Sequence, residues 1–188
     1  HPNAPFLALL LVRGVPPICP SCRVVEVHLQ TEHEGWNTDD FMVVGETGVG
    51  DRKRLVGQIK RSFAVSYSDD DLKGAILDAW QDFTSGTVFD VATDHFVIVT
   101  LLGSNTVLRY FTALLDCARA SADGDEFSRR LATPGFVHSK VVAYSDEIRK
   151  ILDEQEGRAV TFDELRDFLR LLHLLSFDLN SATAQTEA

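Results

Sequence analysis

The chain has 188 residues, of which 45% are hydrophobic and 24% are charged, and its formal net charge is −10 at pH 7. This length suits one domain, or one domain with a helical appendage, and the composition allows a buried core. The longest apolar runs, residues 6–12 and 171–175, fall well short of the roughly 18 residues that span a bilayer, so we expect no membrane segment. Three cysteines, an odd number, argue against a disulfide framework and favour a cytoplasmic location.

The first residue is His1 rather than Met, so we expect a piece of a longer protein. Residues 6–12 follow no basic segment, and we do not expect them to be a signal peptide.

The negative charge is unevenly distributed. Residues 1–62 contain equal numbers of basic and acidic side chains, so the whole excess lies in residues 63–188. An acidic protein binds nucleic acid poorly, because binding depends on neutralising phosphates. A basic strip around Lys60 is nevertheless compatible with nucleic acid. We predict that its other members make the contacts: Arg52, Lys53, Arg54 and Arg61.

The first third of the chain reads as a small antiparallel sheet. Residues 23–31 alternate between apolar and polar side chains, as a half-buried strand does. The predicted elements before residue 62 are the end of a helix at 6–13, strands at 23–31, 41–44 and 55–60, and a glycine-rich turn at 45–50, so that 41–60 forms a hairpin.

The remainder is richer in helices. Ser68 precedes three aspartates, a pattern typical of a helix start, and apolar residues then keep helical spacing to Phe83. Thr161 and Glu164 form a capping-box pattern. The predicted elements are a buried strand at 95–101, a helix from 104–105 to about 120, a loop at 123–125, a short strand at 136–143, helices at 145–155 and 161–175, and a frayed tail from 181. A meander followed by a helical crossover to another strand predicts an α/β fold.

One group of residues in this sheet suggests chemistry. Gln58 and Lys60 are two apart on a predicted strand, so their side chains leave the same face. Asp40 lies at the start of the preceding strand, across the hairpin. Oxygen ligands beside a lysine suit an Mg²⁺ site for phosphodiester hydrolysis, because Mg²⁺ prefers hard oxygen ligands and the lysine offsets developing charge.

These residues resemble a known family. The stretches 39–44 (DDFMVV) and 56–62 (VGQIKRS) resemble the D…QxK form of the PD-(D/E)xK nucleases, in which Gln replaces the acidic residue as in Mrr-like enzymes. The nearest resemblance is to nuclease domains at the N-terminus of bacterial antiviral STAND ATPases and related anti-phage effectors. It extends over roughly residues 31–180, through the helix at 70–83, the strand at 96–100 and the closing segment 168–179, but only 40–62 is specific.

The resemblance implies a restriction-endonuclease-like core, with a mixed sheet flanked by helices, in residues 1–144, and a helical C-terminal extension in 145–188. It implies that Asp40 and Gln58 bind Mg²⁺ and that Lys60 is the catalytic lysine. Many relatives add an upstream acidic ligand, for which Glu32 is the candidate and Glu26 the alternative. The implied activity is cleavage of DNA, most simply double-stranded, in a cytoplasmic homo-oligomer controlled by an ATPase or sensor module in anti-phage defence.

A non-catalytic interaction or scaffold domain is the competing interpretation. It predicts an exposed apolar patch on the helix expected at 161–175.

Two further patterns are weaker. The run 45–50 (GETGVG) is followed by Asp51 where a phosphate-binding loop requires lysine, so a hairpin turn is expected. Cys19 and Cys22, with His28 and His33, offer zinc ligands at unsuitable spacing, and a loop with two thiols is the simpler expectation. His95, His138 and His173 are expected to be isolated structural or surface residues.

Overall fold

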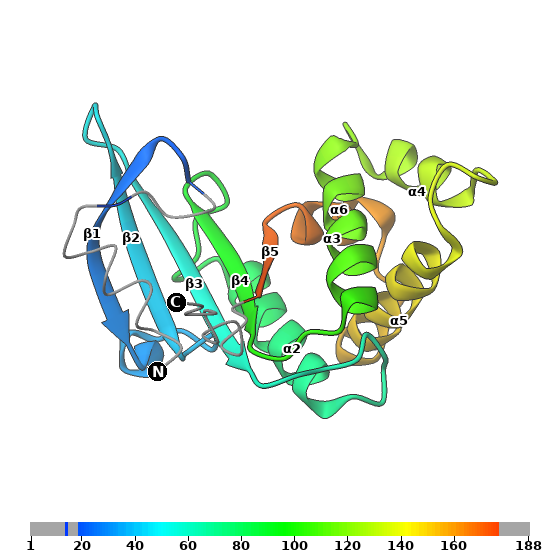
Figure 1. The fold of residues 1–188 in the computed structure, drawn as a ribbon, viewed down its shortest axis with the longest axis horizontal. Coiled ribbons are helices and arrows are strands. Elements are labelled where there is room, and N and C mark those ends of the chain that lie inside the picture. The colour runs from blue at the N-terminus through cyan, green and yellow to red at the C-terminus, as the bar shows by residue number, and fades with distance from the viewer. Residues whose placement is uncertain (1–13, 15–18, 177–188) are drawn as a thin grey trace, which may run out of the picture.

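The computed structural model describes residue 14 and residues 19–176, which form an α/β fold around one five-stranded mixed sheet (Figure 1). The strands follow each other across the sheet in chain order. The first three form an antiparallel meander, and the last two join it in parallel. The strands are β1 (Cys22–Leu29), β2 (Phe41–Thr47), β3 (Arg52–Lys60), β4 (Asp94–Thr100) and β5 (Leu172–Ser176).

Each parallel pairing needs a connection that crosses over the sheet, and helices supply both connections. A single helix lies between β3 and β4, and four helices lie between β4 and β5. A short 3-10 helix, η1 (Thr31–Glu34), joins β1 to β2. The α-helices are α2 (Asp70–Ser85), α3 (Asn105–Ala120), α4 (Gly124–Ala132), α5 (Ser139–Glu156) and α6 (Phe162–Leu169).

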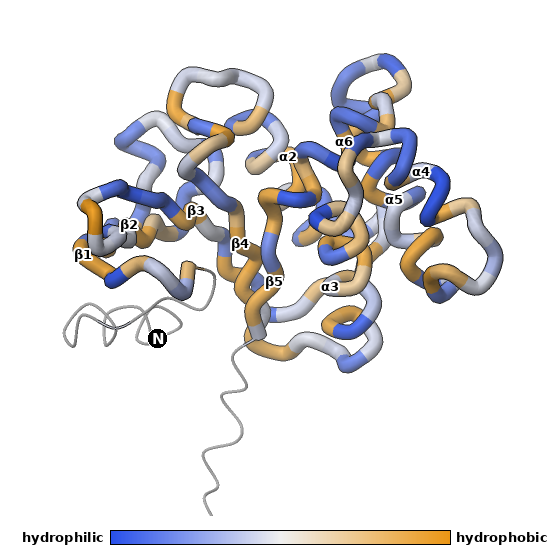
Figure 2. The backbone as a smooth tube through the Cα atoms, turned by 90° about the horizontal axis from the view of Figure 1, so that it is seen from above, coloured by the Kyte–Doolittle hydropathy of each residue, from blue (hydrophilic) through white to orange (hydrophobic). Residues whose placement is uncertain are grey.

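The larger hydrophobic core lies between one face of the sheet and the helices. Even-numbered strand residues such as Met42, Val56 and Phe96 pack there against Trp80 of α2 and Phe168 of α6. In Figure 2, β4 and β5 lie in the middle of the molecule, with the meander on one side and α3, α4, α5 and α6 on the other. This face of the sheet is called the helix face below.

Odd-numbered strand residues form a second, smaller cluster on the opposite face. Its buried members are Phe41, Val43, Leu55, Val97 and Val99, together with the even-numbered Val24 of β1, where the register shifts between Val24 and Glu26. Because side chains alternate along a strand, Gln58 and Lys60 share the helix face with Val56.

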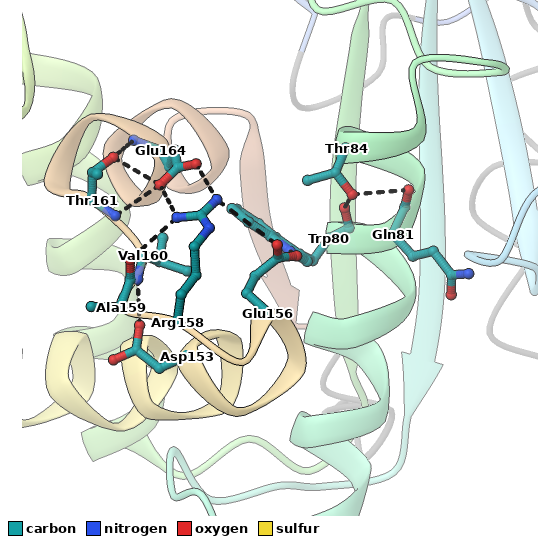
Figure 3. A network of polar contacts seen from close by, with 10 residues as sticks. All are labelled: Trp80, Gln81, Thr84, Asp153, Glu156, Arg158, Ala159, Val160, Thr161 and Glu164. Atoms are coloured by element: carbon teal, nitrogen blue, oxygen red, sulfur yellow. Dashed lines mark hydrogen bonds and ion pairs between the residues drawn. The ribbon is translucent and has the colours of Figure 1, made fainter.

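The C-terminal helices are tied to α2 by a polar network (Figure 3). The Trp80 indole donates a hydrogen bond to Glu156 at the end of α5, with 2.7 Å between Nε1 and Oε1. The loop that follows is held by Arg158, whose guanidinium bonds Glu164 at 2.6 and 3.0 Å. Glu164 and Thr161 also form the capping box that begins α6. The network holds α2 in place against α5 and α6.

Much of the predicted order of elements is confirmed. The expected hairpin is β2 and β3, the buried strand is β4, and the helix from 105 to 120 is α3, capped by Ser104. The helix after Ser68 is α2, although its N-cap is Asp69, whose side chain accepts from the Leu72 amide. The helix expected at 6–13 and the tail from 181 lie outside the described residues.

Three predicted elements are wrong. The strand expected at 136–143 is absent and α5 begins at Ser139 instead, because Val141, Ile148 and Leu152 form a buried helical stripe; the helix expected at 145–155 is confirmed as the rest of α5. The loop expected at 123–125 begins α4, capped by the Asp123 carboxylate. The helix expected at 161–175 ends at Leu169, and β5 follows.

The C-terminal part is therefore not purely helical, because β5 completes the sheet beside β4. The division expected at residue 144 falls inside α5, and residues on both sides of it pack into the larger core.

Candidate active site

Gln58 has a buried amide with one unpartnered atom. The residue lies near the end of β3 on the helix face and is 4% exposed. Its Nε2 donates a hydrogen bond to Asp78 of α2, 2.6 Å from Oδ2. Its Oε1 is buried and has no hydrogen-bond partner. An unsatisfied buried acceptor costs about 1–3 kcal/mol, so Oε1 is a strong candidate to receive a ligand.

Asp40 lies next to Gln58 across the hairpin. Phe41 pairs with Gly57, so extending this register by one residue sets Asp40 opposite Gln58. One carboxylate oxygen of Asp40, Oδ2, accepts a hydrogen bond of 2.6 Å from the Ile59 amide. No hydrogen bond to the other oxygen exists among residues 19–176, which leaves one oxygen of an anchored carboxylate for a ligand.

Lys60 ends β3 on the same face as Gln58. It is half-buried and forms no ion pair with any residue that the structure describes. Its positive charge nonetheless opposes the rise that burial causes in the pKa of the Asp78 carboxyl. The three residues predicted from the sequence thus lie at one end of the helix face, on two adjacent chain segments.

Two aspartates of α2, which the sequence pattern did not single out, complete this environment. Burial raises the pKa of Asp78, while the hydrogen bond from Gln58 and the charge of Lys60 act in the opposite direction. One turn later, Asp82 is fully buried and accepts hydrogen bonds from the backbone amides of Asn37 and Thr38, at 2.9 and 2.8 Å. Asp82 therefore fixes the loop that leads into Asp40.

A signal for Asp82 was present in the sequence. Asp82 occupies a position on the apolar stripe of α2, after Leu72, Ala75 and Ala79. A charged side chain is rarely fully buried without a partner, so an acid on a buried helix face indicates a specific hydrogen-bonding role.

The two candidates for the upstream acidic ligand have different surroundings. Glu32 is exposed in η1 and lines a surface hollow together with Asp39 and Asp40. Glu26 lies on β1 and is bound to His28 at 3.1 Å and to Arg52 at 2.9 Å. The hydrogen bond from His28 is the main cause that lowers the pKa of Glu26. Glu32 is therefore the better placed of the two.

The basic residues do not form one cluster. A strand rises about 3.3 Å per residue, so Arg52 and Lys60 lie about 26 Å apart along β3. Arg54 is bound to the fully buried Asp94 and to the Val88 carbonyl, and Arg52 is paired with two glutamates. Lys53 projects from the opposite face near His95. Of the four residues predicted to contact nucleic acid, Arg61 alone adjoins the site.

The donor set fits Mg²⁺ in kind. This ion prefers oxygen ligands, keeps several waters and commonly uses one or two carboxylates. Asp40 and Gln58 offer one anchored carboxylate oxygen and one unpartnered amide oxygen. Across residues 19–176, no three His, Cys, Asp or Glu side chains converge closely enough to hold a metal ion by themselves. The site therefore depends on Gln58 as well as on acids.

The zinc alternative does not fit the structure. Cys19 and Cys22 are joined by a disulfide bond, so the expectation of two free thiols is wrong. His28 is held between Glu26 and Glu34, which raise its pKa through hydrogen bonds. The glycine-rich run at 45–50 ends β2 and forms the hairpin turn, as expected.

Two histidines expected to be isolated contact each other. His173 Nε2 on β5 lies 3.1 Å from His95 Nδ1 on β4. Burial lowers the pKa of His173 to about 3.

Among residues 19–176, no helix combines the length and apolar character needed to cross a membrane. Comparisons of the chain with protein-family models, with curated proteins and with solved structures find no match.

Proposed function

We propose that this chain is a restriction-endonuclease-like nuclease domain that hydrolyses phosphodiester bonds of DNA with Mg²⁺. The observation that most supports the proposal is the buried, unpartnered Oε1 of Gln58. By strand register Gln58 lies opposite Asp40, whose carboxylate is anchored, and it shares a strand face with Lys60. The resemblance to PD-(D/E)xK nucleases also implies this order of elements: a meander, a crossover helix and a parallel strand.

Each residue has a definable part in this chemistry. Asp40 and Gln58 would hold the ion through one oxygen each, with Glu32, which lines the same surface hollow as Asp40, as the candidate for a further carboxylate. Bound Mg²⁺ would supply the Lewis acidity that phosphodiester hydrolysis needs. Lys60 carries an ammonium without an ion-pair partner in the described residues, so its charge is available to a phosphate oxygen that becomes more negative in the transition state.

The overall charge bears on how the domain is used. The net charge is −10, and one residue predicted to contact DNA, Arg61, lies beside the site. One isolated copy should therefore bind DNA weakly. Assembly of several copies by an ATPase or sensor module would bring several sites to one DNA molecule. This agrees with the anti-phage setting that the resemblance implies. A single copy that cuts DNA efficiently would contradict this part of the proposal.

The scaffold interpretation predicts an exposed apolar patch at residues 161–175, and the structure does not support it. The apolar residues of α6 and β5 that it requires at the surface, including Leu165, Phe168 and Leu172, are buried. The exposed large apolar side chains among the described residues lie on separate elements: Leu29, Val49, Val91, Leu102 and Phe136.

The direct test is plasmid cleavage with Mg²⁺ by the intact protein, activated by its trigger where one is known. Lys60→Ala and Asp40→Ala should each lower the rate about 100-fold or more while the protein stays folded. Lys53→Ala is the matched control, because it removes a lysine from the same strand but from the opposite face. If the parent and all three variants cut equally, or if none cuts, the proposed site is wrong.

A further inference from the structure

We infer that Asp78 is a positioning residue that orients the Gln58 amide so that its oxygen, and not its nitrogen, faces the ion. The inference rests on the proposed function and extends it to a residue on α2. The observation behind it is the 2.6 Å hydrogen bond from Gln58 Nε2 to Asp78 Oδ2.

An amide at a metal site has to be oriented. The side chain of glutamine ends in a carbonyl oxygen, which can bind a cation, and an NH₂ group, which only donates hydrogen bonds. Rotation by half a turn exchanges the two. A carboxylate only accepts hydrogen bonds, so Asp78 holds the NH₂ group of Gln58 and directs Oε1 away from itself. Oε1 is then the unpartnered buried atom.

The helix that carries Asp78 is itself held firmly. Asp69 caps α2 at its start. One turn after Asp78, Asp82 bonds the loop that leads into Asp40. Trp80 of the same helix is buried and bonded to α5. A single helix thus fixes both the loop beside Asp40 and the amide of Gln58.

The pair also accounts for glutamine at this position. A glutamate at residue 58 would set two carboxylates side by side, which disfavours both remaining charged. With Gln58, the negative charge of the pair lies on Asp78, and the oxygen that faces the ion is neutral. Exchanging the amide and the carboxylate keeps the charge of the pair. In Gln58→Glu/Asp78→Asn the side chain at 78 should donate the hydrogen bond and the side chain at 58 should accept it.

The test measures binding of Mn²⁺, a spectroscopic substitute for Mg²⁺, by electron paramagnetic resonance on the intact protein. Asp78→Ala should weaken Mn²⁺ binding about 10–100-fold, as loss of groups that orient ligands does. The double variant Gln58→Glu/Asp78→Asn should recover at least most of that loss. Asp71→Ala removes an exposed aspartate from the first turn of the same helix and is the control for charge and helix effects. It should bind as the parent does.

A second readout does not depend on the ion. The side-chain NH₂ resonances of Gln58 should shift in Asp78→Ala and stay unchanged in Asp71→Ala. If the parent binds Mn²⁺ and Asp78→Ala binds equally well, or the double variant binds no better than Asp78→Ala, the positioning role is refuted while the proposed function stands. If the parent neither binds Mn²⁺ nor cuts DNA, the proposed function fails, and this inference fails with it.

Discussion

Replacing Asp82 with asparagine is expected to destabilise the protein strongly, although it removes only one charge. Asp82 is fully buried and accepts three hydrogen bonds. They come from the Asn37 amide at 2.9 Å, the Asn37 side chain at 2.7 Å and the Thr38 amide at 2.8 Å. An asparagine can keep its oxygen where Asp82 receives the two bonds from Asn37, but its NH₂ group then faces the donor of Thr38.

The magnitude follows from that mismatch. A hydrogen bond to a charged group contributes about 1.5–3 kcal/mol, and a buried amide without an acceptor costs about 1–3 kcal/mol. The two contributions cannot simply be added, because both describe the Thr38 amide. We therefore expect Asp82→Asn to lower the free energy of unfolding by about 2–4 kcal/mol. A domain of this kind is stable by only about 5–15 kcal/mol, and the loss is therefore a large fraction.

Urea unfolding at pH 7 measures the difference, with Asp71→Asn as the exposed control on the same helix. The control should stay within about 0.5 kcal/mol of the parent. Hydrogen exchange should also become faster at the Thr38 amide. An Asp82→Asn variant that unfolds at the same urea concentration as the control would refute the claim that this carboxylate anchors the loop before Asp40.

Three further perturbations test the packing and charges around the sheet. Gly57→Ala should cost about 1–3 kcal/mol in urea unfolding, because an added Cβ would lie 2.4 Å from the buried ring of Phe41; an unchanged midpoint would contradict this. Arg54→Met should lower stability by about 3 kcal/mol, because it leaves the buried Asp94 without its cation. If Arg54 served only to bind DNA, the substitution would weaken DNA binding and leave stability unchanged. The pKa of His173 is lowered to about 3 in the folded state, so below about pH 6.5 the unfolded chain binds more protons and the folded state loses stability as the pH is lowered. His173→Asn should reduce the loss of unfolding free energy between pH 7 and pH 4.5 by up to about 3 kcal/mol. An equal loss in both proteins would refute the assignment.

Local pattern was sufficient for the elements whose environment follows from their own sequence. The helix after Ser104 has a cap and a clear apolar stripe, and the hairpin is built from neighbours in the chain. The prediction failed at residues 171–175, where a run of apolar side chains continues a helical pattern. Leu172 instead pairs with Phe96, a partner 76 positions earlier. The neighbouring strand decides this structure, and no local pattern reveals it.

The candidate site divides in the same way. Gln58 and Lys60 could be found from the sequence because their spacing of two on one strand fixes a shared face, and Asp40 because a hairpin brings it opposite. Asp78 could not be found in this way, since its partner lies 20 positions away on another element. The residues of the predicted basic strip do not form one cluster, for a related reason. Residues adjacent in sequence spread along an extended strand, and Arg54 is used by a buried acid.

The aspartates of α2 show which kind of sequence signal was missed. The helix that crosses from the end of β3 to the start of β4 lies over the face that carries Gln58. Two acids four residues apart on such a helix lie on one side of it, one turn from each other. Asp78 and Asp82 meet the two segments that carry Gln58 and Asp40. An acidic pair at this spacing, directed at a sheet rather than at solvent, therefore indicates a helix that holds a polar site together.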